Sequence, residues 1–400
     1  MLSRRRLLLA TAGLWAGGAR ARPDVGPAAL PEGTLSSSTY DTLPGKLPLI
    51  KKSFRPPNFE TPARVLGEAF TPNEAFFVRY HLSSIPEVDP AAWRLAVGGE
   101  AAAGTLSLSL DVLRREFTPV EIAAVCQCSG NRRGLSNPHV PGVQWGHGAM
   151  GNARWRGVRL KEVLERAGVK SGAVEVAFDG TDSGVVDKTP DFVKSIPAWK
   201  ALDENTLLAY EMNGEPLPHW HGAPLRLVVP GWTATYWIKH LARIEVLAQP
   251  LTGFWMNPAY RIPKGRFPIV DRFVSQENET TTPITEMVVN SLITNLRDRM
   301  LYRSRTPLFV RGIAWDGGYG IARVDVSTDG GRTWGTAELG EDFGRFSTRQ
   351  WSFAFVPEPG DHVVMARATN RLGASQSFEL VFNPAGYHNN VVHSVNIRCT

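Results

Sequence analysis

From residue 71 onward, the hydrophobic residues fall in short runs bounded by Gly, Pro and Asp. Two stretches, LSLDVLRREF (108–117) and LKEVLERAGV (160–169), have helical spacing, with Ser/Asp capping candidates in the first and a Gly stop in the second. Strands with occasional helices, not in strict alternation, predict an α+β domain over residues 71–250. The runs predicted as strands are AFFVRYHL (75–82), WRLAVGG (93–99), EIAAVCQCSG (121–130), VEVAF (174–178), LRLVVPG (225–231) and ARIEVLA (242–248).

A second series of runs after residue 283 is evenly spaced and interrupted by tight Asp-Gly-Gly and Pro-Gly turns. This pattern predicts an all-β immunoglobulin-like sandwich over residues 283–400. Its predicted strands lie in VNSLITNL (289–296), PLFVRGIAW (307–315), IARVDVSTDGGRTW (321–334), RQWSFAFVPEPG (349–360), DHVVMARATN (361–370) and SQSFELVFNP (375–384).

Two segments lack a clear hydrophobic period. Residues 22–70 are rich in Pro and Ser, which predicts an extended arm laid over the body or partly disordered. Residues 251–282 are also irregular and predict a linker between the two domains. The total of 400 residues, 43% hydrophobic and 20% charged, is long and apolar enough for two or three domains, and it excludes a disordered chain or a disulfide miniprotein.

The first 21 residues have the layout of an export signal. They contain Arg4, Arg5, Arg6 and Arg20 but no acidic residue, with an apolar run over 7–18 that is shorter than the roughly 20 residues of a membrane span. The sequence SRRRLL at 3–8 fits the twin-arginine type and predicts a periplasmic protein. An ordinary secretory signal and an organelle transit peptide are the alternatives. No later segment is long and apolar enough to span a membrane.

The signal also explains most of the positive charge. The whole chain has 44 basic and 38 acidic side chains, a net charge of +6 that by itself would indicate a nucleic-acid or membrane-surface partner. Residues 22–400 contain 40 basic and 38 acidic side chains, so their net charge is only +2. We therefore expect no nucleic-acid partner.

Cysteine usage points to a metal. Cys126 and Cys128 would point to the same face of a strand, which is poor geometry for a disulfide. A free thiol in an oxidising compartment needs a reason, and metal ligation is one. Arg132 and Arg133 follow Cys128 in a Gly-Asn turn, and nearby cations favour the thiolate that ligates metals. The alternative is that Cys128 is a small core residue and the arginines are surface charges.

Two further clusters are suited to binding an anion. Arg79 and His81 fall on one face of a predicted strand and can clamp an oxyanion by charge-assisted hydrogen bonds. His221 is followed by Arg226 and Lys239, which could form a basic wall for a phosphorylated cofactor. The His219-x-His221 pair could instead bind zinc or copper, but no carboxylate or third histidine lies at close spacing.

Together these residues carry a family resemblance. The segment QCSGNRR (127–133) resembles the cysteine motif of the sulfite oxidase family of molybdenum enzymes. GAMGNARWRGV (148–158) is similar to the bacterial sulfite:cytochrome c oxidoreductase branch, and WDGG (315–318) with STDGGRTW (327–334) resembles the family's dimerisation domain. Other matching segments fall in the family's order: RYH (79–81), DGTD (179–182), HGAPLR (221–226) and VPG (229–231).

The resemblance implies a role for each candidate residue. Cys128 would be the thiolate ligand of molybdenum, beside the dithiolene sulfurs of molybdopterin. Arg79 and Arg133 would frame the substrate pocket with Tyr260, from the NPAYRI segment of the predicted linker. The residues that would contact the pterin and its phosphate are Arg79, His81, Asp182, His221, Arg226 and Lys239. Cys126 and Cys399 receive no role.

The implied activity is the oxidation of sulfite to sulfate at one molybdenum–molybdopterin centre per chain, with arginines easing entry of the anion. No Cys-x-x-Cys-His motif occurs, so we expect no haem on this chain and a separate periplasmic c-type cytochrome as electron acceptor or subunit. The sandwich domain suggests a homodimer, with a cytochrome heterodimer as the alternative. Rival activities are nitrate reduction and sulfoxide reduction on the same fold. A non-catalytic periplasmic binding protein is the distant alternative.

Overall fold

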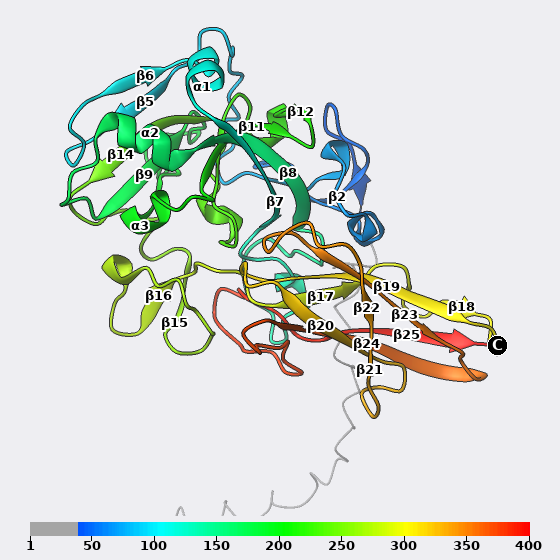
Figure 1. Ribbon diagram of the computed structural model, residues 1–400. Helices are drawn as coiled ribbons and strands as arrows, with labels where there is room; N and C mark the ends of the chain where they lie inside the picture. Colours follow the sequence, from blue (N-terminus) through cyan, green and yellow to red (C-terminus); the bar gives the residue numbers. More distant parts are fainter. Residues whose placement is uncertain (1–38) are drawn as a thin grey trace, which may run out of the picture.

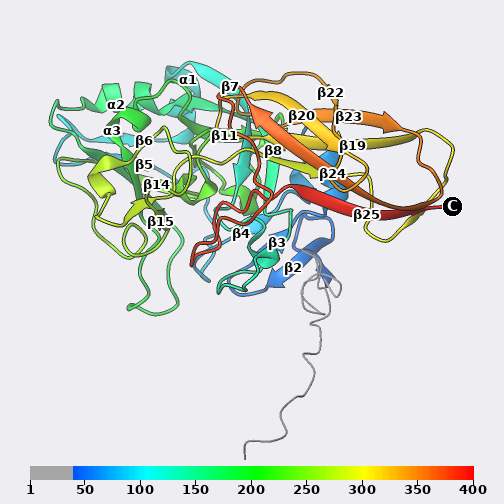
Figure 2. The ribbon, with the colours of Figure 1, turned by 90° about the horizontal axis from the view of Figure 1, so that it is seen from below.

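The computed structural model describes residues 39–400 as two β-rich domains joined by a linker (Figure 1). The predicted signal over 1–21 and residues 22–38 of the predicted arm lie outside the described residues. Seen from below, the first domain and the sandwich lie at opposite ends, and the strands β2 (Leu49–Ser53), β3 (Asn58–Glu60) and β4 (Val78–Arg79) lie between them on one side (Figure 2). Within residues 39–400, no helix is both long and apolar enough to cross a bilayer.

The segment after residue 38 forms a small antiparallel sheet. Within residues 39–70, part of the predicted arm, the chain forms three short paired strands. Prolines and lysines interrupt the alternation of apolar and polar residues in these strands, so the sequence pattern did not predict them. Leu49 and Phe59 are buried here with Val78 and Tyr80, so this segment has a core of its own. The sheet runs in the order β1 (Tyr40–Asp41), β2 (Leu49–Ser53), β3 (Asn58–Glu60) and β4 (Val78–Arg79).

Two larger sheets form the body of the first domain. One has the order β10 (Lys194–Pro197), β9 (Glu175–Gly180), β14 (Leu241–Leu247), β5 (Leu95–Gly98) and β6 (Leu106–Leu108). The other has the order β12 (Glu215–Pro216), β11 (Leu207–Met212), β8 (Met150–Arg159) and β7 (Pro119–Gln127), with β13 (Arg226–Val228) paired to β11. Trp145, Trp155 and Trp232 are completely buried in the core of this domain.

Helices are few and short. Both predicted helices are confirmed, as α1 (Leu110–Glu116) and α2 (Leu160–Ala167), and α3 (Ala198–Ala201) is a single turn. The Ser109 side chain accepts a hydrogen bond from the Val112 amide at the start of α1, and Gly168 ends α2 with a φ of 74°. The 3₁₀ turns are η1 (Ala63–Gly67), η2 (Asn73–Ala75), η3 (Arg133–Leu135), η4 (His219–His221), η5 (Ala234–Tyr236) and η6 (Val274–Gln276).

The C-terminal domain is a sandwich of two sheets, so the predicted order of an α+β domain followed by an all-β sandwich is confirmed. One sheet has the order β17 (Asn290–Ile293), β19 (Leu308–Trp315), β23 (Arg349–Phe355) and β22 (Glu338–Leu339). The other has the order β18 (Leu301–Tyr302), β25 (His393–Cys399), β24 (Gly360–Asn370), β20 (Ile321–Ser327) and β21 (Gly335–Thr336).

One predicted strand of the sandwich is wrong. Residues 375–384 form isolated bridges rather than a strand, and the chain then turns at Asn383, whose side chain bonds to the backbone of Tyr387. Phe378 and Phe382 are exposed, so the apolar residues that resembled a strand pattern do not enter the sandwich core. This segment instead crosses toward the first domain, where the Ala385 carbonyl accepts a hydrogen bond from Arg133.

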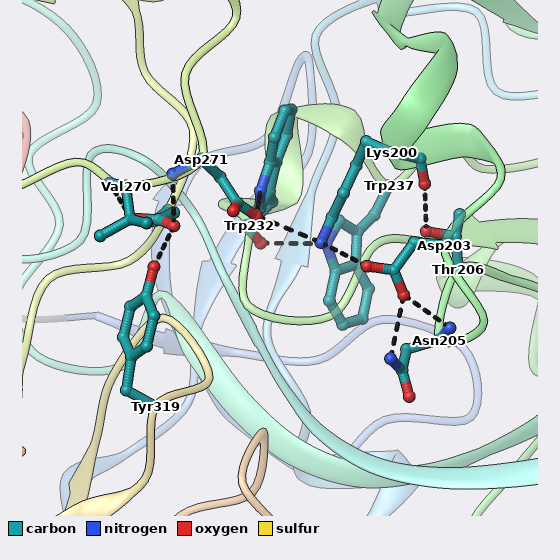
Figure 3. A network of polar contacts seen from close by, with 10 residues as sticks. Lys200, Asp203, Asn205, Thr206, Trp232, Trp237, Val270, Asp271 and Tyr319 are labelled. Carbon is teal, nitrogen blue, oxygen red and sulfur yellow. Dashed lines mark hydrogen bonds and ion pairs between the residues drawn. The ribbon is translucent and has the colours of Figure 1, made fainter. Parts of the chain in front are cut away.

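The linker is fastened to both domains. Its strand β15 (Arg261–Pro263) pairs with β16 (Thr281–Pro283). Asp271 of the linker forms an ion pair with Lys200 of α3 and accepts a hydrogen bond from the Trp232 indole (Figure 3). Glu286 accepts hydrogen bonds from the Val270 and Asp271 amides and from the Tyr319 hydroxyl of the sandwich. This network fixes residues 270–271 of the linker to both domains.

Candidate active site

A cavity in the first domain brings together eight of the nine candidate residues. They come from strands, turns and the linker that are far apart in sequence, and each lines the same cavity: Arg79, His81, Cys128, Asp182, His221, Arg226, Lys239 and Tyr260. Asp182 is the only carboxylate among the lining residues, whereas three of them are arginine or lysine. The cavity therefore has the composition of an anion site.

Cys128 lies at the end of β7, where the strand stops and the chain turns. Its amide donates to the Ala149 carbonyl at 2.9 Å, and its own carbonyl accepts from the Asn131 amide at 2.9 Å. Just before it, the Gln127 side chain accepts a 2.6 Å hydrogen bond from the Trp315 indole of the sandwich. Because hydrogen bonds fix the backbone of Cys128 and the neighbouring Gln127 side chain, the Cys128 thiol has a defined position in the cavity wall.

Arg79, His81 and Tyr260 form one end of the cavity. The Arg79 guanidinium donates to Asn58 Oδ1 at 3.1 Å and to the Tyr80 carbonyl, while its Nε is buried without a partner. His81 Nε2 contacts the Tyr260 hydroxyl, and the His81 ring stacks on Phe192 with centroids 3.6 Å apart. Burial, with Arg79 and Lys239 nearby, lowers the pKa of His81 well below its usual value, so its imidazole is neutral.

Arg226 and Lys239 also line the cavity and form a cationic wall. Arg226 donates weakly to the Trp237 carbonyl at 3.4 Å, and its Nε is buried without a partner. Lys239 donates to the Arg79 carbonyl at 2.9 Å and lies 2.8 Å from the centre of the Tyr80 ring. Burial and the adjacent Arg226 lower the pKa of Lys239 well below its usual value. Cations crowded in this way are stabilised by a bound anion.

His221 and Asp182 complete this wall with different partners. The Lys46 ammonium, from the segment that precedes β2, lies against His221 Nε2. Burial, together with Lys46, lowers the pKa of His221 well below its usual value. Burial raises the pKa of Asp182 to about 6, and Lys239 acts in the opposite direction. Sequence reasoning missed Lys46 because nothing in the proline-rich arm shows that it reaches a residue 175 positions away.

Arg133 is the one candidate residue that does not line the cavity. Its Nε donates to the Ala385 carbonyl at 2.7 Å, and its guanidinium lies 5.1 Å from the centre of the Tyr387 ring. The Tyr387 ring in turn stacks on Tyr260, with centroids 5.8 Å apart and planes inclined by 6°. Arg133 therefore reaches the cavity only through Tyr387, a residue of the irregular 375–392 segment that no sequence pattern identified.

The two domains each match a known protein-family model. Residues 81–255 match the oxidoreductase molybdopterin binding domain, and residues 281–400 match the Mo-co oxidoreductase dimerisation domain. The sulfite oxidase of Arabidopsis thaliana is 30% identical over 393 residues, which cover 92% of this chain and 98% of the plant protein. The chain belongs to the sulfite oxidase family.

Other relatives of this sulfite oxidase family member are longer. The mitochondrial sulfite oxidase of Rattus norvegicus is 39% identical over 313 residues, which are 76% of this chain and 56% of the rat protein. A nitrate reductase of Phaseolus vulgaris is 32% identical over 302 residues, only 34% of its length. Among solved structures, the sulfane dehydrogenase SoxCD from Paracoccus pantotrophus superposes with a TM-score of 0.75 and 25% identity, covering 96% of this chain and 94% of that one.

The cofactor of this family member is molybdenum–molybdopterin. The cavity fits it, because the buried Nε atoms of Arg79 and Arg226 lack partners and the cationic wall lacks an anion. Cys128 would bind the metal, and His221, Arg226 and Lys239 would hold the pterin and its phosphate. Within residues 39–400, no group of three His, Cys, Asp or Glu side chains is arranged to hold a metal ion.

Proposed function

We propose that this chain oxidises sulfite to sulfate and belongs with the bacterial sulfite:cytochrome c oxidoreductases. The observation that carries the proposal is the end of the cavity where Arg79, His81 and Tyr260 meet beside the Cys128 thiol. The sulfite oxidase relatives support the choice of substrate. Sulfite is a compact anion, and a cationic cavity with few carboxylates suits it.

The cofactor, when bound, supplies the two-electron redox change and the oxygen transfer. The protein binds and orients the anion. Arg79 donates hydrogen bonds from a guanidinium already held by Asn58, so little reorganisation is needed when sulfite arrives. The neutral His81 contacts the Tyr260 hydroxyl through Nε2 and so holds this hydroxyl in the cavity, where it can hydrogen-bond the anion.

Sulfite and water yield sulfate, two protons and two electrons, so two one-electron acceptor molecules are reduced in each turnover. We propose a periplasmic c-type cytochrome as that acceptor, either as a passing partner or as a subunit. Twin-arginine export before residue 22 would fit this location, since that route carries proteins that already hold a cofactor. The match to a dimerisation domain over residues 281–400 supports a homodimer.

The deciding experiment is a substrate comparison on the full chain purified with its cofactor. Sulfite-dependent reduction of cytochrome c is measured beside nitrate reduction and sulfoxide reduction driven by a dye. We expect sulfite to be the good substrate and about one molybdenum per chain by elemental analysis. Faster turnover of nitrate would favour the activity of the Phaseolus relative. If the protein folds but contains no molybdenum when it is made in a molybdenum-competent host, the proposed enzymatic activity is refuted.

A further inference from the structure

One buried lysine near the cavity has no counter-ion. Lys194, the first residue of β10, is only 1% exposed. Its ammonium donates a 2.6 Å hydrogen bond to the Trp255 carbonyl, and within residues 39–400 no carboxylate lies within ion-pair distance of it. Burying a charge without an opposite charge is destabilising. The charge of Lys194 therefore calls for an explanation other than stability.

The surroundings of Lys194 supply that explanation. Its Nζ lies 5.1 Å from the centre of the Tyr260 ring and 4.8 Å from the centre of the Tyr236 ring, at cation–π distance from both. Trp255, which accepts its hydrogen bond, packs its ring against His81 with centroids 5.2 Å apart. Lys194 thus contacts the 255–260 segment at both ends, and it does not itself line the cavity.

We propose that Lys194 is a positioning residue for Tyr260. Its ammonium holds the 255–260 segment, so that the Tyr260 hydroxyl stays against His81 and directed at the bound anion. The inference rests on the proposed function, because it assumes that Tyr260 contacts the anion. Lys194 acts through the tyrosine and not on the substrate itself.

The charge of Lys194 can change within the ordinary pH range. Burial, helped by Arg261, lowers the pKa of Lys194 to about 7, while Glu175 acts in the opposite direction. Glu175 is already occupied, since it accepts hydrogen bonds from the Ser195 and Ser275 hydroxyls at 2.6 Å. The titratable or charged groups on the elements around Lys194 are Tyr236 of η5, Tyr260 and Arg261 of the linker, Glu175 of β9, Lys200 of α3 and the neutral His81.

A double-mutant cycle tests whether Lys194 acts through Tyr260. Four cofactor-loaded proteins are compared: wild type, Lys194→Met, Tyr260→Phe and the double variant. We expect Lys194→Met to lower kcat/KM for sulfite about tenfold in the wild-type background and less than about twofold in the Tyr260→Phe background, where no hydroxyl remains to be positioned. Equal losses in both backgrounds would overturn the proposal, because they would mean a general structural effect.

The pH dependence of kcat/KM and the pH dependence of unfolding stability both test whether the charge of Lys194 matters. A residue that only fills space would change neither dependence. The wild-type kcat/KM should fall as pH rises through about 7 and the ammonium is lost, and Lys194→Met should lack this decline. Lys194→Arg keeps the charge and should retain activity above pH 8. Identical pH profiles for wild type and Lys194→Met would refute the role.

The unfolding profile does not depend on sulfite. Between pH 7 and 10 the unfolded chain holds a proton on Lys194 that the folded chain has lost, so wild-type stability should rise with pH relative to Lys194→Met. Lys200→Met is the matched control, since Lys200 is a buried lysine paired with Asp203 and Asp271 outside the cavity. It should lose stability and keep the wild-type pH profile. Wild-type protein that fails to oxidise sulfite would refute the proposed function and with it the role of Lys194 toward sulfite. Active wild-type protein with equal losses in both backgrounds would refute the role of Lys194 alone.

Discussion

Two groups of buried cations in this protein differ in their charged neighbours. Lys200 lies between Asp203 and Asp271, at 3.3 and 3.4 Å, in the network that joins α3 to the linker (Figure 3). Arg226 and Lys239 in the cavity wall have, within the described part of the chain, no carboxylate at ion-pair distance. The charge of Lys200 is balanced by carboxylates of the chain itself, whereas the charges of Arg226 and Lys239 would be balanced by a bound anion.

The difference shows where to look for a ligand. A buried ion pair satisfied by the chain indicates a structural joint, and a buried cation facing a cavity without a partner indicates a missing anion. Binding energy from that anion then offsets the desolvation of the cations, so cofactor loading should stabilise the fold by mass action. The predictions below test this distinction.

The largest effect is expected at Cys128. Cys128→Ser removes the one thiol assigned to the metal, and sulfite-dependent cytochrome c reduction should fall by at least about 100-fold, since removing groups that merely support a metal ligand already costs 10–100-fold. Molybdenum content and turnover are measured on the same preparation. Cys399→Ser, which removes a buried thiol from the sandwich, is the control and should keep both. Retained activity in Cys128→Ser would remove the ligand assignment.

Arg226→Met and Lys200→Met test the comparison itself. Lys200→Met leaves two partly exposed carboxylates unpaired and should cost about 2–3 kcal/mol of stability, below the value for fully buried pairs. Arg226→Met removes an uncompensated charge, so the cofactor-free protein should unfold at nearly the wild-type midpoint while its molybdopterin content drops. Thermal unfolding with and without cofactor separates the two variants. Equal destabilisation of the two cofactor-free variants would mean that the cavity cations are structural.

The two arginines assigned to the substrate should differ. Arg79→Met removes a donor that lines the cavity, and the KM for sulfite should rise about 10- to 100-fold, the equivalent of one hydrogen bond to a charged group. Arg133→Met should raise it less, because Arg133 reaches the cavity only through Tyr387 and Tyr260. Steady-state kinetics over a range of sulfite concentrations measures both. A larger effect in Arg133→Met would place its guanidinium in direct contact with the anion.

Much of this architecture could be predicted from local patterns. Both main helices and most strands follow from periodicity and caps. Six of the eight cavity residues belong to clusters that the residue chemistry itself singled out, whereas Asp182 and Tyr260 were indicated only by the family resemblance. Such motifs are short and contiguous, so sequence reasoning can find them.

Long-range contacts from segments without a pattern could not be predicted. Tyr387 and Lys46 come from irregular or proline-rich stretches, and their positions depend on tertiary packing. The sequence also did not show that the Arg133 side chain points toward Ala385 and not into the cavity. Arg132 has a φ of 67°, so the two adjacent arginines diverge, Arg132 to Asn290 and Arg133 to Ala385. Sequence identifies the guanidinium groups, but the turn decides where they point.

A buried titratable group can also remain uncharged, as His388 does. The smallest expected effect is the change in the pH dependence of stability when this histidine is replaced. His388 packs against Phe267 at 4.9 Å, its Nε2 has no partner, and burial lowers its pKa to about 3. Between pH 6.5 and 3 the unfolded chain therefore binds a proton that the folded chain does not. Stability should fall as pH drops through this window, by up to about 1.4 kcal/mol per pH unit for this histidine. His388→Asn suits the φ of 56° and should weaken this acid sensitivity in unfolding experiments between pH 7 and 4. An unchanged pH dependence would mean that His388 accepts its proton in the folded state, as a group with a counter-ion would.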